Sequence, residues 1–258
     1  MMADRRFSVS RVARIRLVAV IGFIAFIEML CRTEIIDPLT MIPPSRMVFE
    51  LVKILASGRM NEHIVSTLIN VATALALAII VGFVAGALLF VLPRARRVID
   101  PLLATYYAIP IFVFYPFFVV LFGLNRYPQI AIGFLLGVVA MIVNTLNGFD
   151  RVPKVLLKTA RVYKLGRIRT IVRVILPYAA LYICTGLKLA VAYSFIGVIA
   201  AEFILAGEGM GYEISFAFND FDNRTMYPLI LLIIVAATVI NMALYAWEKK
   251  YAQRQTER

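Results

Sequence analysis

The sequence predicts an all-α polytopic membrane protein with about six transmembrane helices and both termini in the cytoplasm. Hydrophobic residues make up 62% of the 258-residue chain and charged residues only 16%, whereas soluble domains are about one quarter charged. The formal net charge of +12 is not gathered in a polar domain, which argues against nucleic-acid binding. It lies in short segments between apolar runs, which is the pattern that sets topology in a bilayer.

The first observation is the number of apolar segments. A helix needs about 20 residues to cross about 30 Å of hydrocarbon. The segments that meet or nearly meet this length are 17–31, 68–92, 102–124, 129–147, 177–205 and 227–247. The first is short and follows several arginines, as in a secretory signal peptide, but no small-residue cleavage site precedes Cys31. We therefore expect it to be retained as a helix.

The second observation is the distribution of basic residues. Segments 1–16, 93–100, 150–176 and 248–258 hold 20 of the 27 Lys and Arg. Because basic residues concentrate on the cytoplasmic side, these segments predict a basic cytoplasmic tail over 1–16 and a cytoplasmic loop over 150–176. Segments 35–67 and 206–226 then lie on the periplasmic side.

The apolar spacing within these segments predicts further detail. Val48, Leu51, Val52 and Leu55 recur at helical spacing before Gly58, so we expect a helix along the outer membrane surface that ends at this glycine. The pairs Gly82/Gly86 and Gly133/Gly137 have the spacing that lets membrane helices approach closely.

The third observation is the segment 151–177, RVPKVLLKTARVYKLGRIRTIVRVILP, which holds eight Lys or Arg and no acid. On a helical wheel one side carries Lys154, Lys158, Arg161 and Lys164, and another carries Leu156, Leu157, Ala160 and Tyr163. A second helical pattern follows Gly166, and Pro177 suits the first turn of the next membrane helix. Most basic loops only touch water and anionic lipid, but regular apolar faces need a surface to bury against.

This segment resembles the cytoplasmic loop of the membrane subunits of bacterial ABC importers, in the sulfonate, taurine and nitrate permease family. That loop reads approximately LLEAARTLG, a spacer and VILP. Leu156, Leu157, Ala160 and Arg161 match its start, and residues 174–177 match its end. Similar residues follow in order over about residues 20–247: Glu28, Arg32, Pro43, Pro44, Ser45, Ile109, Pro110, Phe122, Gly123, Asn144, Thr145, Gly186, Leu187, Lys188, Ala201, Glu202, Gly209, Met210, Gly211 and Tyr212.

The resemblance implies a single permease domain over 1–258 that forms the pathway of an ATP-driven importer in the bacterial inner membrane. The expected solute is a small organic or inorganic anion, such as a sulfonate or an aromatic acid. The implied partners are ABC ATPase subunits that carry ATP and Mg, a second permease copy, a periplasmic substrate-binding protein and membrane lipid. Coupling to the ATPase is expected at Lys154, Leu157, Lys158, Thr159, Ala160, Arg161, Lys164 and Gly166.

The chain departs from the family at two positions of this loop. Lys158 stands where the family has Glu, and Lys164 stands where it has Gly. Replacing an acid by a base reverses the sign of the contact, which costs several kcal/mol where a like charge faces it. We therefore expect an adjusted ATPase groove, or pairing with a second, different permease that carries the regular motif.

We expect no catalytic residue, metal site or cofactor in this chain itself. The sequence contains no G-x-x-x-x-G-K-[ST] motif, one histidine (His63), and two distant cysteines, Cys31 and Cys184. The glycine-rich run at 207–211 follows an apolar segment rather than a strand, so it is interpreted as a turn at the outer face.

Candidate pathway residues come from intramembrane charges and from aromatic residues. Lys188 and Glu202 lie within the fifth apolar segment, where a charge is a functional candidate, although structural pairing is the commoner reason for keeping one. Two prolines, Pro110 and Pro116, interrupt the aromatic third segment, and bent helices often line transporter cavities. Tyr106 and Tyr115 are therefore expected to face the pathway.

Two other functions are compatible with a polytopic chain. A gradient-driven secondary transporter needs coupling acids and typically internal repeats, whereas only Glu28 and Glu202 are candidate acids and no repeat is evident. A membrane-embedded enzyme needs clustered Asp, His or Cys, and the nearest candidate, residues 219–222, has no histidine beside it. Neither alternative uses the basic loop.

Overall fold

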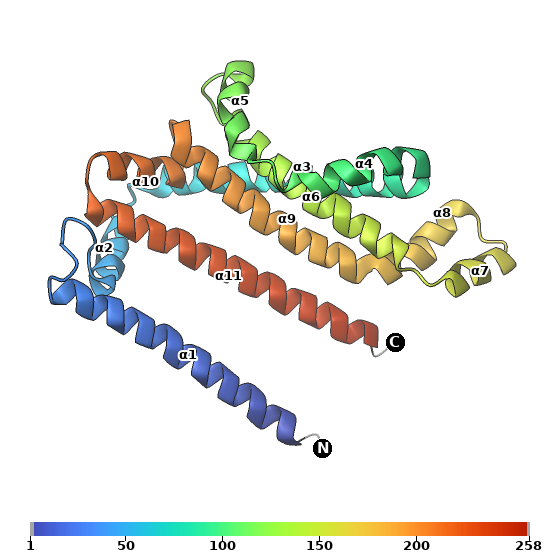
Figure 1. Ribbon diagram of the computed structural model, residues 1–258, viewed down its shortest axis with the longest axis horizontal. Helices are drawn as coiled ribbons and strands as arrows, with labels where there is room; N and C mark the ends of the chain where they lie inside the picture. Colours follow the sequence, from blue (N-terminus) through green and yellow to red (C-terminus); the bar gives the residue numbers. More distant parts are fainter. Residues whose placement is uncertain (1–2, 257–258) are drawn as a thin grey trace. The chain divides into compact units, whose positions relative to one another are not determined.

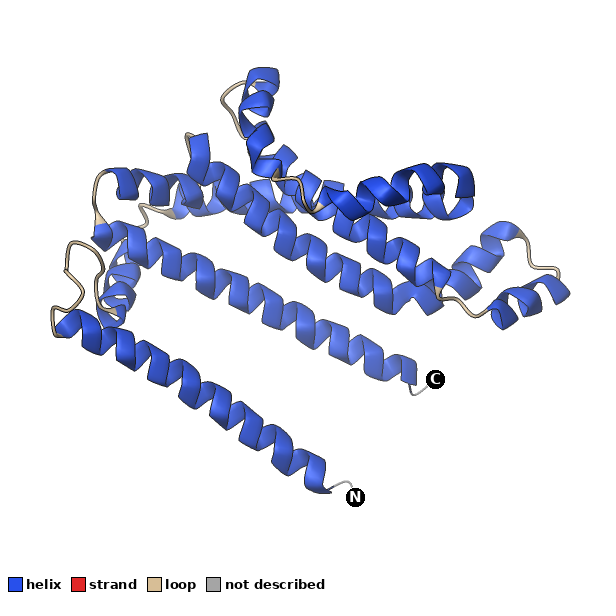
Figure 2. Cartoon of the chain, viewed as in Figure 1, coloured by secondary structure: helices blue, strands red, loops and turns tan. Residues whose placement is uncertain are grey.

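The computed structural model describes the backbone of residues 3–256 and the side chains of residues 14–166, 168–204 and 206–250. All regular structure in the described backbone is helical (Figure 1, Figure 2). Most of the predicted basic tail over 1–16 lies outside the described side chains. The helices are α1 (Ala3–Arg32), α2 (Pro44–Ala56), α3 (Asn61–Val91), α4 (Pro93–Tyr106), η1 (Ile111–Phe114), α5 (Tyr115–Phe122), α6 (Tyr127–Asp150), α7 (Lys154–Val162), α8 (Arg167–Thr170), η2 (Ile171–Ile175), α9 (Leu176–Leu205), α10 (Met210–Asn219) and α11 (Asn223–Thr256).

The described chain divides into two compact units. The first contains α1, α2 and the segment Glu213–Ile233, and the second contains Glu62–Tyr212 and the C-terminal part of α11. The larger, second unit holds the bundle of α3, α6 and α9, in which α6 and α9 run side by side (Figure 1).

Small residues bring the three bundle helices into close contact, as the paired glycines predict. A Cβ atom on Gly82 of α3 would lie 2.7 Å from the Cβ atom of Met141 on α6. A Cβ atom on Gly133 of α6 would lie 2.6 Å from a methyl group of Val198 on α9. Since real Cβ contacts are longer, these positions accept only glycine at the observed helix spacing.

Four helical stretches among the described residues are long and apolar enough to cross a membrane: Asn61–Val91, Tyr127–Asp150, Ile168–Ile204 and Asn223–Lys250. A fifth span is present if the bent pair α4 and α5 counts as one. The first predicted span is helical within α1 but is not among these stretches. The all-helical class is therefore confirmed, while the count of six spans remains a prediction.

The third predicted span is broken rather than merely bent. Pro93–Tyr106 and Ile111–Phe122 meet at an angle of 98°. Pro110 has no backbone N–H and disfavours helical conformation in the residue before it, which accounts for a break at residues 107–110. Pro116 lies in the first turn of α5, where a missing N–H is tolerated.

In the first unit, Glu28 joins the end of α1 to the start of α2. Its carboxylate accepts hydrogen bonds from Arg32 Nε (2.6 Å), from the Ser45 backbone N–H (2.9 Å) and from Ser45 Oγ (2.6 Å). An acid that accepts the N–H groups at a helix start is electrostatically favoured. The predicted helix before Gly58 is confirmed as α2, and Gly58 has a left-handed φ of 72°, as expected of a glycine just beyond a helix.

The basic loop forms the helix, turn and helix that its pattern predicts, with one difference at its end. The second helix does not stop before Pro177 but runs on through the π-helical turn η2 into α9. A π-turn shifts the hydrogen-bond partners by one residue, so the missing N–H of Pro177 is absorbed without ending the helix.

Candidate functional site

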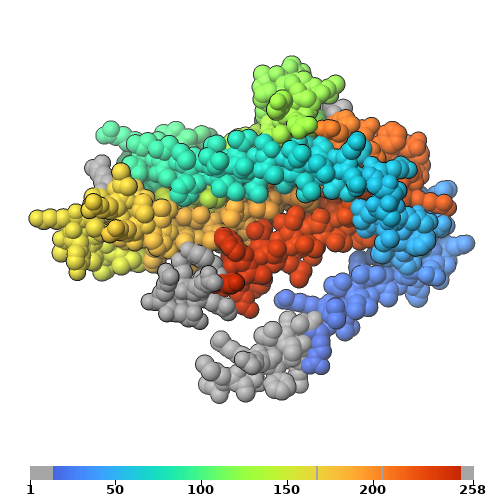
Figure 3. All heavy atoms as spheres, turned by 180° about the vertical axis from the view of Figure 1, so that it is seen from behind, coloured from blue at the N-terminus to red at the C-terminus, as the bar shows by residue number. Residues whose placement is uncertain are grey.

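The basic helix α7 projects from one end of the second unit (Figure 1; yellow in Figure 3). Ala160 is buried, and Leu157 packs against the cluster of Phe149, Val152, Ile175 and Ala179, which anchors the helix to α6, η2 and α9. Lys154, Lys158, Arg161 and Lys164 are all exposed. The apolar face is only half used, because Leu156 and Tyr163 are also exposed. The helix therefore offers a mixed basic and apolar surface.

Lys164 has a backbone conformation that suits glycine. Its φ is 52°, in the left-handed region. The Leu165 N–H donates to Ala160 O (2.9 Å) and the Lys164 N–H donates to Arg161 O (2.9 Å), which is the Schellman pattern that ends a helix. Gly166 is not among the residues with positive φ. The structural demand for glycine therefore lies at position 164, where the resembling family has it.

Replacing Lys164 by glycine is expected to stabilise the end of α7. A left-handed side-chain residue costs about 1 kcal/mol relative to glycine. Hydrogen exchange at the Leu165 amide is therefore expected to slow about fivefold. Gly166→Ala is the matched control, since no atom lies within 4 Å of a Cβ there and exchange should hardly change. Equal exchange in wild type and Lys164→Gly would contradict the strained conformation.

The second cluster is centred on Glu202, which is only 1% exposed. Its carboxylate accepts hydrogen bonds from Thr67 Oγ1 (2.8 Å), Asn70 Nδ2 (3.3 Å) and the Gly211 N–H (3.2 Å). Thr67 Oγ1 also accepts the Met210 N–H (2.8 Å). The carboxylate thus joins α3, α9 and the first turn of α10, where a negative charge is favoured by the helix dipole.

The glycine-rich run at 207–211 closes around this carboxylate. Gly209 has φ 114°, and a Cβ atom there would lie 2.3 Å from the carboxyl carbon of Glu202. Its N–H donates to His63 Nδ1 (3.2 Å). The expected turn is therefore also the wall of a buried polar site. Thr67 and Asn70 were not among the predicted residues, because a single polar residue in an apolar helix has no spacing signal.

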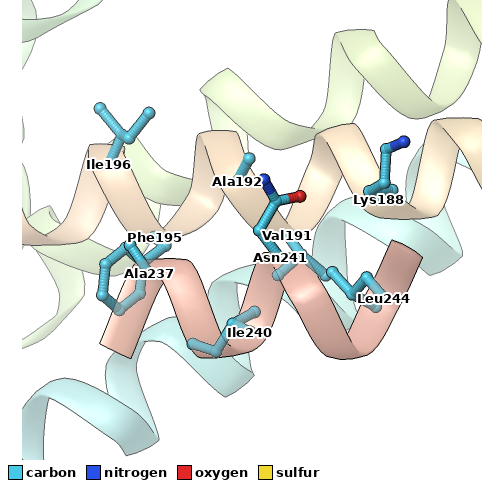
Figure 4. Close-up of a pocket in the computed structure, with 9 residues that line it drawn as sticks. All are labelled: Lys188, Val191, Ala192, Phe195, Ile196, Ala237, Ile240, Asn241 and Leu244. Carbon is cyan, nitrogen blue, oxygen red and sulfur yellow. The ribbon is translucent and has the colours of Figure 1, made fainter. Parts of the chain in front are cut away.

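Lys188 forms an ion pair with Glu248 of α11. The Nζ–Oε2 distance is 2.9 Å, and the two side chains are 29% and 20% exposed. Thr185 Oγ1 donates to the other carboxylate oxygen (3.0 Å). Lys188 also lines a largely apolar cavity of about 150 Å³ between α9 and α11, with Asn241 as another polar side chain among its lining residues (Figure 4).

The two predicted pathway tyrosines lie on either side of the break in the third span. Tyr106 is half-buried, and its hydroxyl donates to Leu135 O of α6 (3.0 Å). Tyr115 is buried in a cluster with Ile132 and Ala201. Tyr115 therefore anchors α5 against α6 and α9. On the other side of the break, the ring of Tyr107, which follows Tyr106 in the chain, lies 6.1 Å from the ring of Tyr193 on α9.

Residues 78–257 match the family described as the binding-protein-dependent transport system inner membrane component. This match covers more than half of the chain. The chain belongs to that family. This inner membrane component has four described helical stretches that are long and apolar enough to cross a membrane, and the similar proteins are named as permease proteins.

Two characterised relatives show the breadth of the family. The chain is 29% identical over 179 residues to the nitrate import permease protein NrtB of Leptolyngbya laminosa. This alignment covers 69% of this inner membrane component and 64% of NrtB. It is 25% identical over 222 residues to the taurine transport system permease protein TauC of Escherichia coli K12, covering 84% of this chain and 81% of TauC. The match thus spans less than two thirds of NrtB.

The fold of this inner membrane component is similar to that of a solved transporter chain. It aligns with a chain from the inward facing conformations of the MetNI methionine ABC transporter with a TM-score of 0.65 and 15% sequence identity. The alignment covers 80% of this chain and 97% of that one. At this identity the similarity concerns the fold.

Proposed function

We propose that this chain is the membrane-spanning subunit of an ATP-driven ABC importer and forms the pathway for a small solute delivered by a periplasmic binding protein. ATP and Mg bind to separate ATPase subunits and not to this chain. The observation that carries this proposal is α7, a helix anchored through Ala160 and Leu157 whose basic face is exposed. A family membership that names a binding protein supports the rest.

In the proposed arrangement one permease domain spans the membrane about six times, with both termini cytoplasmic. The basic segment 150–176 lies on the cytoplasmic side with the ATPase, and anionic lipid surrounds it. The segments 35–67 and 206–226 lie on the periplasmic side, where the binding protein docks. Nucleic acid is not a partner.

The exposed lysines of α7 and of the turn after it indicate the charge expected on the ATPase surface. Lys154, Lys158 and Lys164 form no ion pair with any described residue. An acidic groove would complement them, whereas a basic groove would repel them. The importer therefore contains either a matching acidic ATPase groove in a homodimer, or a second permease that provides the regular contact.

The proposed solute is a small organic or inorganic anion, such as a sulfonate or an aromatic acid. The similar proteins NrtB and TauC are named for nitrate and taurine; nitrate is an inorganic anion, and taurine carries a sulfonate group. The aromatic residues around the break at 107–110, including Tyr106, Tyr107 and Tyr193, would suit a planar solute.

The test is purification of a tagged full-length chain from gently solubilised native membranes, followed by identification of the proteins that co-purify. We expect an ABC ATPase at a stoichiometric level. A second permease in the same complex would indicate a heterodimer. Absence of any ATPase would contradict the importer and favour the gradient-driven secondary transporter, which needs only this chain.

Lys158→Glu tests the docking surface within the same experiment. Reversal of one exposed charge against an acidic groove is expected to lower ATPase recovery about tenfold or more at low salt. Lys53→Glu is the control for charge reversal, because Lys53 is an exposed helical lysine of α2, which lies outside the proposed docking surface; its contact with Glu50 at 3.4 Å is a surface pair that contributes little. Unchanged recovery with Lys158→Glu would place the docking contact elsewhere.

A further inference from the structure

The N-terminal half of the broken third span is held by polar contacts to α6 and by two partly buried side chains, Leu103 and Tyr106, which pack against a buried cluster of α3 and α6. None of the described residues of α4 is buried. At the C-terminal end of α4 the Tyr106 hydroxyl donates a hydrogen bond to Leu135 O of α6. Between α4 and α6 lies a cavity of about 320 Å³, lined by residues that include Asp100, Ala104, Tyr107 and Asn147. An element with few buried contacts is one that can move as a unit.

At its N-terminal end α4 is bound to α6 by one arginine. Arg96 Nη1 and Nη2 donate to the two carboxylate oxygens of Asp150 (2.8 and 2.6 Å), and Arg96 Nε donates to Asp100 (3.2 Å). A bidentate arginine–carboxylate contact fixes both the distance between the two side chains and their relative orientation. Arg94 and Arg97 are exposed, so Arg96 is the arginine of this turn that reaches α6.

Both partners are unfavourable within their own helices. Arg96 lies in the first turn of α4, where a positive charge opposes the helix dipole, and Asp150 is the last residue of α6, where a negative charge does the same. The ion pair between the two residues compensates for the unfavourable position of each charge in its own helix. Residues that break a local rule and are compensated at long range mark functional positions.

Asp150 also lies next to the basic helix. It is followed by Arg151, the buried Val152 and Pro153, the residue just before α7. A displacement of α7 therefore reaches the Asp150 carboxylate through three residues of chain. The break at 107–110 and the anchored Tyr115 beyond it supply a hinge and a fixed point for α4.

We propose that Arg96 and Asp150 form a clasp that transmits movement of α7 to α4, so that α4 swings about the break at 107–110 and changes the cavity between α4 and α6. This proposal rests on the proposed function, because α7 moves only if an ATPase is docked on it. Arg96 and Asp150 are positioning residues: they bind each other and not the solute.

The test measures α4 movement and ATP hydrolysis separately in the co-purified complex. Ala104→Cys and Asn147→Cys, one on each side of the cavity, are introduced with Cys31 and Cys184 replaced by serine. Cross-linking by a short bifunctional maleimide is compared with ADP and with ATP plus vanadate. With the clasp intact, we expect the cross-linking rates in the two nucleotide states to differ about tenfold.

Asp150→Asn and Arg96→Gln are expected to remove this difference while the complex still assembles and hydrolyses ATP. Asp100→Asn is the matched control, because Asp100 contacts the same arginine but belongs to α4 itself, and it should keep the difference. Arg96→Lys, which keeps the charge without the two-pronged contact, should retain only part of it.

The outcomes separate the two proposals. A nucleotide-dependent difference that survives in Asp150→Asn, or that is absent with the clasp intact, overturns the clasp while leaving the importer in place. Loss of hydrolysis together with loss of the ATPase from the Asp150→Asn complex also overturns it, because Asp150 would then serve docking. Failure to recover any ATPase with wild-type protein overturns the importer and the clasp together.

Discussion

Replacing Glu202 by alanine is expected to destabilise the second unit by about 3 kcal/mol, because three buried donors lose their acceptor and each such loss costs about 1–3 kcal/mol. The donors are Thr67 Oγ1, Asn70 Nδ2 and the Gly211 N–H. Since they come from α3 and α10, the variant should also loosen the glycine-rich turn. We expect the Tm of the detergent-solubilised protein to fall by about 6–12 °C.

Two further variants define this result. Glu202→Gln keeps the shape but presents an amide N–H₂ to the surrounding donors, so its effect should be intermediate. Glu208→Ala is the matched control, since Glu208 lies in the same turn, is about half exposed and faces Arg126 at 3.9 Å, and contacts of this kind contribute little. A Tm of Glu202→Ala within 1 or 2 °C (roughly the effect of an exposed substitution) would contradict a buried junction.

Separating Lys188 from Glu248 is expected to have the second largest effect. Either single alanine substitution leaves a partly buried charge without its partner, which costs about 2 kcal/mol at this exposure. The reversed pair Lys188→Glu/Glu248→Lys should recover at least half of that loss. The measurement is a double-mutant cycle on the Tm of the purified protein with Lys188→Ala, Glu248→Ala and their double variant, and the reversed pair is measured beside it.

The cycle also distinguishes the two roles considered for Lys188. Tyr245→Leu is the control, because the Lys188 Nζ lies 6.0 Å from that ring and its removal should change the Tm little. Should Lys188→Ala leave the Tm unchanged and abolish solute uptake, the lysine would be a pathway residue rather than a structural partner. Recovery by the reversed pair supports the structural role.

Much of the architecture was predictable because its signals are local. Helical spacing up to Gly58 predicted α2, and the alternation of basic and apolar residues predicted α7. The glycine pairs predicted the close approach of α3, α6 and α9, since a missing side chain allows contact whichever helix is the neighbour. The break at Pro110 was visible as an interruption, but its angle of 98° depends on the packing of Tyr115 beyond it.

The site was predictable only in part. The family resemblance drew attention to Glu202, Lys188 and the glycine-rich run, but not to what they contact. The partners of Glu202 on α3 lie 135 and 132 residues away, and Glu248 lies 60 residues from Lys188. Thr67 and Asn70 are ordinary polar residues in an apolar helix, and Glu248 is the first residue of the basic segment 248–258, so the sequence alone gives it no partner.

Periodicity, breakers and the distribution of charge were therefore sufficient for the membrane class, the helices and the exposed basic element, since each depends on residues a few positions apart. Which carboxylate faces which donor was decided by tertiary packing. Burial removes water as an alternative partner for Glu202, and partial burial restricts water around Lys188 and Arg96, so each of the three is paired across helices. No short window of sequence contains both members of such a pair.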